Sequence, residues 1–213
     1  MATLDFPYSE RPYQMALLLA VVTIVYNLVE GGLATTMGYA DESLVLFGFG
    51  VDSFIEVISG AGIIQMVLRI RRKPHSPRGD FEKTALQITG TAFYLLAVGL
   101  VISSGYNLYT GHQPQTTLWG VVISSASIGV MWLLVWQKRR VGKQLDSEPI
   151  LADASCTLVC IYMSLILLVS SAVYELFGWP YVDSIGTLGL AFYAFREGRE
   201  CFEKAQSEKY CSC

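Results

Sequence analysis

The sequence predicts an all-α integral membrane protein, a bundle of six transmembrane helices. Of its 213 residues, 53% are hydrophobic and only 15% are charged, and the mean hydropathy is +0.44. Six apolar segments follow one another, and most reach the roughly 20 residues that a helix needs to cross the hydrocarbon core. The basic residues lie only in alternate connections between these segments. Together these observations argue against an ordinary soluble domain.

The predicted helices are bounded in chain order by short polar or basic connections. Residues 1–14 are acidic and aromatic and lack the basic start of a signal peptide, so we expect the first helix to be retained. The sixth segment is short and borrows Pro180 and residues 196–198 at its ends. We expect one membrane domain over residues 1–202, because the tail at 203–213 is too short for a core of its own. The predicted crossings are residues 15–38, 44–70, 85–109, 117–137, 150–176 and 181–197.

The distribution of basic residues predicts the orientation of the bundle. All 15 Lys and Arg residues fall in four places: Arg11, residues 69–83, residues 138–143 and the region after Phe195. The intervening loops at 38–43, 110–116 and 177–182 contain none. Because positive charge marks the cytoplasmic side, we expect both termini to be cytoplasmic, with the cell (inner or plasma) membrane as the location. Nothing in the pattern suggests a nucleic-acid partner.

Asp52 and Glu56 are the most unusual residues in the predicted crossings, because they interrupt the apolar segment at residues 44–70. A carboxylate near the bilayer centre costs about 2.5–3.5 kcal/mol on insertion scales. Their spacing of four residues places both side chains on one helix face, with roughly 5–6 Å between Cβ atoms. The pair is therefore close enough to share one cation.

Cys156 and Cys160 show the same spacing in the fifth predicted helix. By themselves they are equally compatible with small apolar core residues. Combined with Asp52 and Glu56, they supply the four ligands of a tetrahedral zinc-type site. Without metal, buried acids and thiols tend to hold protons, so metal binding and proton release would be coupled. The sequence thus indicates a metal/proton exchanger.

Three stretches carry a family likeness. Residues 50–57 read Gly-Val-Asp-Ser-Phe-Ile-Glu-Val, residues 142–154 read Gly-Lys-Gln-Leu-Asp-Ser-Glu-Pro-Ile-Leu-Ala-Asp-Ala, and residues 178–183 read Gly-Trp-Pro-Tyr-Val-Asp. With the order of six helices, these resemble the transmembrane part of the cation diffusion facilitator (cation efflux) family, without its usual C-terminal cytoplasmic domain. The likeness extends to about Phe202. Family members carry metal-binding pairs on the second and fifth helices.

The resemblance implies a secondary transporter that exports a divalent transition metal from the cytoplasm in exchange for protons, and it places Cys156 and Cys160 at the ligand positions of the fifth helix. Glu56 stands where the family has Asp, and the two Cys stand in place of His and Asp. Thiolates favour zinc, with Cd²⁺, Fe²⁺ and Cu⁺ as alternatives, and no prosthetic group is expected. We expect a homodimer formed through membrane helices, with the lipid bilayer, metal ions and protons as further partners.

Four other polar residues are candidates for an auxiliary metal or proton path. Asn27 and Glu30 lie one turn apart on the first predicted helix, and Glu30 is equally suited to a polar contact within the bundle. Asp153 fits a stabiliser of its helix dipole better than a ligand on the access path. Asp183 fits an N-terminal cap of the sixth helix equally well.

Residues outside the crossings offer weaker candidates for a cytoplasmic metal site. His75 stands among basic residues and is more typical of a solvated loop. Cys211 and Cys213 near the C-terminus suit soft-metal capture or palmitoylation.

Three other classes of function compete with transport. A metal-binding membrane sensor or scaffold would use the same ligands without moving the ion. A channel would need a continuous polar lining, which the single polar cluster does not offer. An enzyme is not expected, because the sequence shows no Ser/His/Asp set and no phosphate loop.

Overall fold

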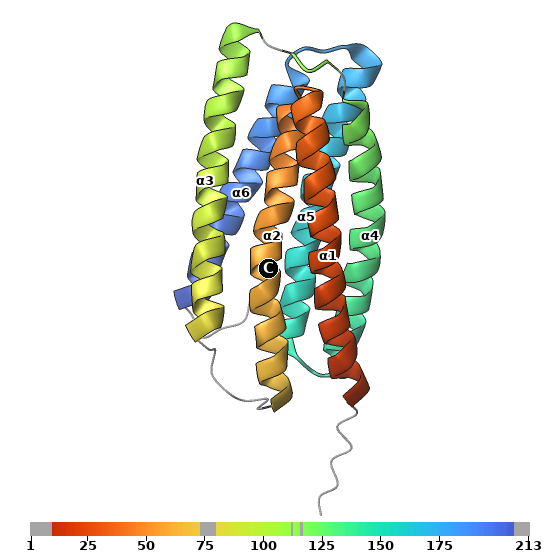
Figure 1. Ribbon diagram of the computed structural model, residues 1–213, viewed down its shortest axis with the longest axis vertical. Coiled ribbons are helices and arrows are strands. Elements are labelled where there is room, and N and C mark those ends of the chain that lie inside the picture. The colour runs from red at the N-terminus through yellow and green to blue at the C-terminus, as the bar shows by residue number, and fades with distance from the viewer. Residues whose placement is uncertain (1–9, 73–79, 112, 116, 207–213) are drawn as a thin grey trace, which may run out of the picture.

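Six helices account for nearly all of the computed structural model, which describes residues 10–72, 80–111, 113–115 and 117–206 (Figure 1). Their bounds are α1 (Glu10–Ala40), α2 (Leu44–Arg72), α3 (Asp80–Thr110), α4 (Leu118–Gln144), α5 (Glu148–Phe177) and α6 (Val182–Gln206). The predicted all-α bundle of six helices is confirmed. Most of the helices extend beyond the predicted crossings, and α6 takes in residues 203–206 of the predicted tail.

The extra turns carry charged residues that a hydropathy pattern assigns to loops. On α6, Arg196 pairs with Glu200 at 3.2 Å and Arg199 pairs with Glu203 at 2.7 Å, both at a spacing of four residues. Such pairs support a helix beyond the hydrocarbon layer. Among the described residues, α1 to α5 are long and apolar enough to cross a membrane, and α6 is more polar.

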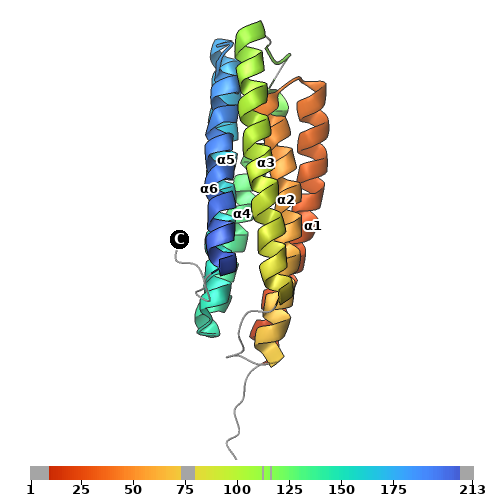
Figure 2. The same ribbon diagram turned by 90° about the vertical axis from the view of Figure 1, so that its left-hand side faces the viewer.

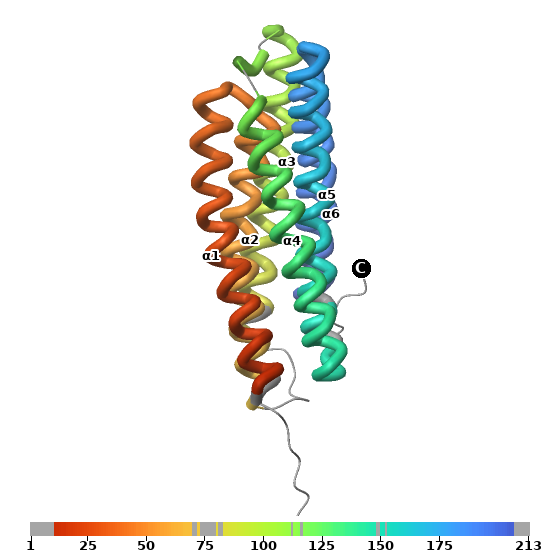
Figure 3. The backbone as a smooth tube through the Cα atoms, turned by 90° about the vertical axis from the view of Figure 1, so that its right-hand side faces the viewer, coloured from red at the N-terminus to blue at the C-terminus, as the bar shows by residue number. Residues whose placement is uncertain are grey.

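All six helices run along the long axis of the bundle (Figures 1 and 3). They form three closely packed pairs: α1 with α2, α3 with α6, and α4 with α5. Figure 2 shows the α3–α6 pair side by side on one face. Helix α2 also contacts α3, α5 and α6 and so lies where the three pairs meet. We call the end where α1 begins and α6 ends the terminal end, and the opposite end the loop end.

Large apolar side chains cover the outside of the bundle. Leu95 on α3 is 70% exposed, and Trp132 on α4 is 66% exposed. On a soluble monomer, a continuous surface of this kind would drive association. On a multi-pass membrane protein it faces lipid, which agrees with the composition of the helices.

The two closest helix pairs touch through glycine. A Cβ atom added at Gly50 of α2 would lie 2.5 Å from the backbone nitrogen of Thr35 on α1. A Cβ added at Gly198 of α6 would lie 3.1 Å from the carbonyl oxygen of Gly90 on α3. Small residues let helix backbones approach at this distance, the usual basis of packing in membranes.

The core on the loop-end side is densely packed. Leu46 and Phe49 of α2 pack with Leu167 of α5 and Leu190 of α6, and all four side chains are buried. The hydroxyl of Ser164 on α5 donates to that of Ser127 on α4 at 2.9 Å, just toward the terminal end from this cluster. These contacts hold α2, α4, α5 and α6 together in the loop half of the bundle.

Candidate metal centre

A cavity of about 130 Å³ occupies the terminal half of the bundle, and all six helices contribute to its wall. Its deep end is lined by Asn27, Glu56 and Cys160. Lys138, Glu197, Cys201 and Lys204 line it nearer the terminal end. Most of the remaining lining is apolar, so these polar groups are the chemistry that a bound ion would meet.

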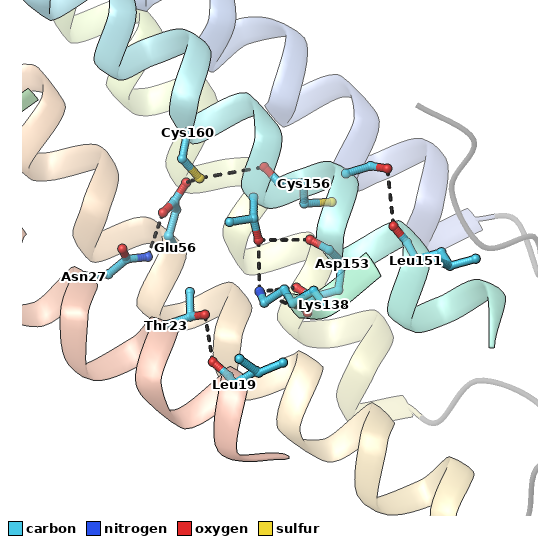
Figure 4. A network of polar contacts seen from close by, with 11 residues as sticks. Leu19, Thr23, Asn27, Glu56, Lys138, Leu151, Asp153, Cys156 and Cys160 are labelled. Atoms are coloured by element: carbon cyan, nitrogen blue, oxygen red, sulfur yellow. Dashed lines mark hydrogen bonds and ion pairs between the residues drawn. The ribbon is translucent and has the colours of Figure 1, made fainter. Parts of the chain in front are cut away.

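Glu56 joins three helices at the deep end of the cavity (Figure 4). Its Oε2 accepts a hydrogen bond from Nδ2 of Asn27 on α1 at 2.6 Å, and its Oε1 accepts one from Sγ of Cys160 on α5. The expected meeting of the second and fifth helices therefore occurs at Glu56 and Cys160. An acid and a thiol in direct contact offer two ligands of the kind that zinc takes.

Asp52 lies one turn from Glu56 toward the loop end and is only 2% exposed. Its Oδ1 has no hydrogen-bond partner among the described residues. Buried polar atoms are almost always paired, so an orphaned carboxylate oxygen here suits a group whose partner is a mobile cation.

Cys156 takes a different direction from Cys160. Lys204 of α6 donates to the Cys156 sulfur at 3.4 Å, and Figure 4 shows that sulfur pointing away from Glu56. A spacing of four residues on a helix leaves two side chains rotated by about 40°, so a pair can face two neighbours. Within the described ranges, no three His, Cys, Asp or Glu side chains stand together in an arrangement that holds a metal. Three of the four predicted ligands, Glu56, Cys156 and Cys160, thus line the cavity. Asp52 lies one turn from Glu56, and the four do not converge on one point.

Glu30 belongs to a hydrogen-bonded group beside the predicted ligands. Its Oε1 accepts from the Tyr26 hydroxyl at 2.9 Å, and its Oε2 accepts from Ser53 at 3.2 Å. Ser53 follows Asp52 on α2, so Glu30 and the predicted ligands are linked through that helix. Asn27 contacts Glu56 directly, and its Oδ1 has no hydrogen-bond partner among the described residues.

Asp153 forms a buried ion pair that the sequence did not suggest. Lys138 of α4, only 3% exposed, lies 3.0 Å from its Oδ2 and also donates to Thr157 at 2.9 Å. The interpretation of Asp153 as a stabiliser of the helix dipole did not anticipate this pair, in which its carboxylate faces α4. The predicted fourth crossing ended one residue before Lys138, which instead belongs to α4 and is buried.

Asp183 of α6 accepts hydrogen bonds at the start of α2. It lies in the first turn of α6, and its Oδ1 and Oδ2 accept from the Ser43 hydroxyl at 2.6 Å and the Leu44 backbone nitrogen at 3.0 Å. These groups form the start of α2, whose first backbone donors need acceptors. Asp183 thus stabilises α2 at the loop end, away from the cavity.

Three predicted residues cannot be compared with the structure, and one residue of the cavity was not predicted. His75, Cys211 and Cys213 lie outside the described residues. Glu197, conversely, was not singled out from the sequence, although it continues the buried stripe of α6 that includes Leu190 and Ala194. The spacing of these residues at the period of a helix could have indicated that Glu197 is buried.

Comparison with known proteins agrees with the six-helix fold. Residues 16–208 match the model of the cation efflux transmembrane domain. A curated relative, the uncharacterized transporter sll1263 of Synechocystis sp., is 23% identical over 187 residues. The match covers 85% of this chain and 58% of that relative, so the chain spans just over half of its length. The six-helix bundle, the acid pair on α2 and the family match over nearly the whole chain lead to one conclusion: this chain belongs to the cation efflux family of membrane transporters.

Proposed function

We propose that the protein is a proton-coupled secondary transporter of a soft divalent transition metal, most plausibly Zn²⁺. The transport site would lie at midmembrane between α2 and α5 and would use Asp52, Glu56, Cys156 and Cys160. The observation that carries the proposal is the contact of Glu56 with Cys160 at the deep end of the cavity. A homodimer in the cell membrane with cytoplasmic termini is the assembly that we propose.

The donor set favours soft and borderline cations. Cys160 offers sulfur and Glu56 offers oxygen at one point, and Asp52 adds a carboxylate oxygen that lacks a hydrogen-bond partner among the described residues. Zn²⁺ and Cd²⁺ accept such mixed sets, whereas Mg²⁺ and Mn²⁺ prefer oxygen alone. Convergence of all four ligands would require Cys156 to turn from Lys204 toward Glu56, a change that metal binding itself would favour.

The Glu56–Cys160 contact also gives the proton coupling a physical basis. The Cys160 thiol donates its hydrogen to Oε1 of Glu56, so the pair holds at least one proton when no metal is bound. Formation of a sulfur–metal bond requires the thiolate, and the thiol proton must therefore leave. When protons return, they compete with the metal for the same two groups. Metal and protons would thus occupy the site in turn.

The position of the cavity suggests which side supplies the metal. It lies in the terminal half, where the basic residues concentrate, while Phe49, Leu167 and the Ser164–Ser127 hydrogen bond pack the loop half. With basic ends on the cytoplasmic side, this arrangement corresponds to a site loaded from the cytoplasm. Export then follows if the helices rearrange to open the loop half.

A flux assay in proteoliposomes tests the proposal. The wild-type protein should move Zn²⁺ when a pH gradient is imposed, and Glu56→Gln should abolish this flux because the amide supplies neither negative charge nor proton exchange. Glu203→Gln makes the same chemical change on exposed α6 surface and should leave the flux intact. Equal flux in the two variants, or none in the wild type, would refute the proposal.

A metal-binding sensor or scaffold is the second candidate. It is favoured by one specific observation, that the four predicted ligands do not yet surround a common point. Equilibrium dialysis would then show Zn²⁺ bound in a manner that depends on Glu56, together with no flux under any gradient. That combination separates binding without transport from the transport that we propose.

A further inference from the structure

A second polar group lies in the same cavity, between α5 and α6. Glu197 and Cys201 stand one turn apart on α6, and Cys156 of α5 lines the cavity with them. We call these three residues the α5–α6 site. Cys201 is a buried free thiol, and Glu197 is 7% exposed. None of the family motifs used to predict the transport site includes Glu197 or Cys201.

Glu197 indicates that this place is built for a cation. Its Oε1 is buried in the cavity wall and has no hydrogen-bond partner among the described residues. Glu197 lines the same cavity as Cys156 and Glu56. A buried carboxylate oxygen without a hydrogen bond is costly unless a positive charge comes to it.

A cation already lies beside the α5–α6 site in the form of an ammonium group. Nζ of Lys204 is 3.4 Å from Sγ of Cys156 and 3.4 Å from Oε2 of Glu200. Lysine is long and flexible, and Lys204 stands in the last turn of α6. Its side chain can therefore withdraw to Glu200 alone and leave Cys156 to an incoming ion.

We propose that Cys156, Glu197 and Cys201 form a second binding site for a soft divalent cation, occupied before the ion reaches Glu56 and Cys160. Two thiolates and one carboxylate are a donor set for Zn²⁺ or Cd²⁺. The three side chains do not stand together in this structure, so they converge as the ion binds. The ion displaces the Lys204 ammonium, and the thiol protons leave as the sulfur–metal bonds form. This inference deepens the proposed function, because it rests on a soft metal being the cargo.

The spacing on α5 explains how the ion would pass inward. Cys156 and Cys160 are one turn apart, about 6 Å along the helix axis. A cation bound to Cys156 at the α5–α6 site lies one such step from the Glu56–Cys160 contact. Cys156 thus serves both sites, in keeping with its sulfur accepting a hydrogen bond from Lys204 of α6.

Cadmium binding to a chain with only two thiols tests the inference. The chain has five cysteines, so Cys160→Ser, Cys211→Ser and Cys213→Ser leave only Cys156 and Cys201, and Glu56→Gln removes the deep acid. We expect this variant to bind one Cd²⁺ and to show ultraviolet thiolate-to-cadmium absorption. Adding Cys201→Ser should abolish the absorption, and adding Glu197→Gln should weaken binding at least about tenfold.

The controls keep the result independent of folding and of transport. Glu203→Gln in the same background should bind Cd²⁺ normally, and in the wild-type chain Cd²⁺ should slow alkylation of Cys201. Cadmium absorption unaffected by Cys201→Ser and Glu197→Gln would overturn the α5–α6 site. Zn²⁺ flux that depends on Glu56 would then still support transport, whereas cadmium bound at the α5–α6 site without any flux would refute transport alone.

Discussion

Lys138 of α4 and Asp153 of α5 form an ion pair of 3.0 Å on the wall of the cavity that also holds Glu56. Thr157 accepts a further hydrogen bond from the same ammonium group at 2.9 Å. The pair places an ammonium group, balanced by the Asp153 carboxylate, in the wall of a cavity that Glu56 and Glu197 also line. It also joins α4 to α5, the helix that carries both predicted thiol ligands.

Removing the Lys138 charge should destabilise the bundle. Lys138→Met leaves the Asp153 carboxylate buried without its counter-ion, which typically costs about 3–5 kcal/mol. Chemical unfolding in detergent micelles would measure the change. The double variant Lys138→Met/Asp153→Asn should recover much of the loss, because neither charge remains. A single variant as stable as the wild type would mean that the pair contributes nothing.

Replacing the deep thiol should change the preferred metal. Cys160→Ser exchanges sulfur for oxygen beside Glu56, so affinity for Cd²⁺ should fall by at least about tenfold and affinity for Mn²⁺ should change little. Isothermal titration with each metal would give both values. Glu203→Gln serves as a comparison, since it alters an exposed side chain of α6 and leaves the Glu56–Cys160 contact intact. Equal losses for the two metals would contradict a role for sulfur in selectivity.

Loss of the Asp183 side chain should affect stability rather than metal binding. Asp183→Ala removes the acceptor for Ser43 and for the backbone nitrogen of Leu44, and such caps are worth about 0.5–2 kcal/mol. Unfolding measurements should show this loss, while the Zn²⁺ affinity stays unchanged. A marked loss of Zn²⁺ affinity in a folded Asp183→Ala protein would instead support the auxiliary metal role first considered.

Two glycines of similar local structure should respond differently to a methyl group. Gly50→Ala would press against the backbone of Thr35 on α1 and should cost about 1–3 kcal/mol. Gly99→Ala on α3 meets no atom within 4 Å and should be neutral or slightly stabilising, because alanine favours helix. Thermal unfolding of both variants would test the contrast. Equal melting temperatures would argue against close contact of α1 and α2.

The fold was predictable because helix length in a membrane follows directly from apolar length. The segments at 44–70 and 150–176 contained few charges, and both became helices with those spans inside them. The ends were less predictable. Residues such as Arg72 and Lys138 belong to helices because backbone hydrogen bonding does not stop where the hydrocarbon layer ends.

The candidate site was predictable only in part, because the sequence pattern of a single helix does not determine its rotation and register against neighbouring helices. The spacing of Asp52 and Glu56 identified a shared face, and Glu56 does meet Cys160. Residue spacing did not predict the contact of Cys156 with Lys204, because that contact depends on the rotation of α5 against α6. Glu197 escaped notice because charges near the end of a predicted crossing usually face water.

The three helix pairs each bring a different part of the cation chemistry to the centre. The pair α1–α2 carries Glu56, the pair α4–α5 carries Cys156 and Cys160, and the pair α3–α6 carries Glu197. A dication bound by residues of all three pairs would cross-link helix pairs that otherwise contact one another less closely. Binding and release of the ion would then change the rigidity of the whole bundle, and the pairs could move relative to one another only after the ion has left.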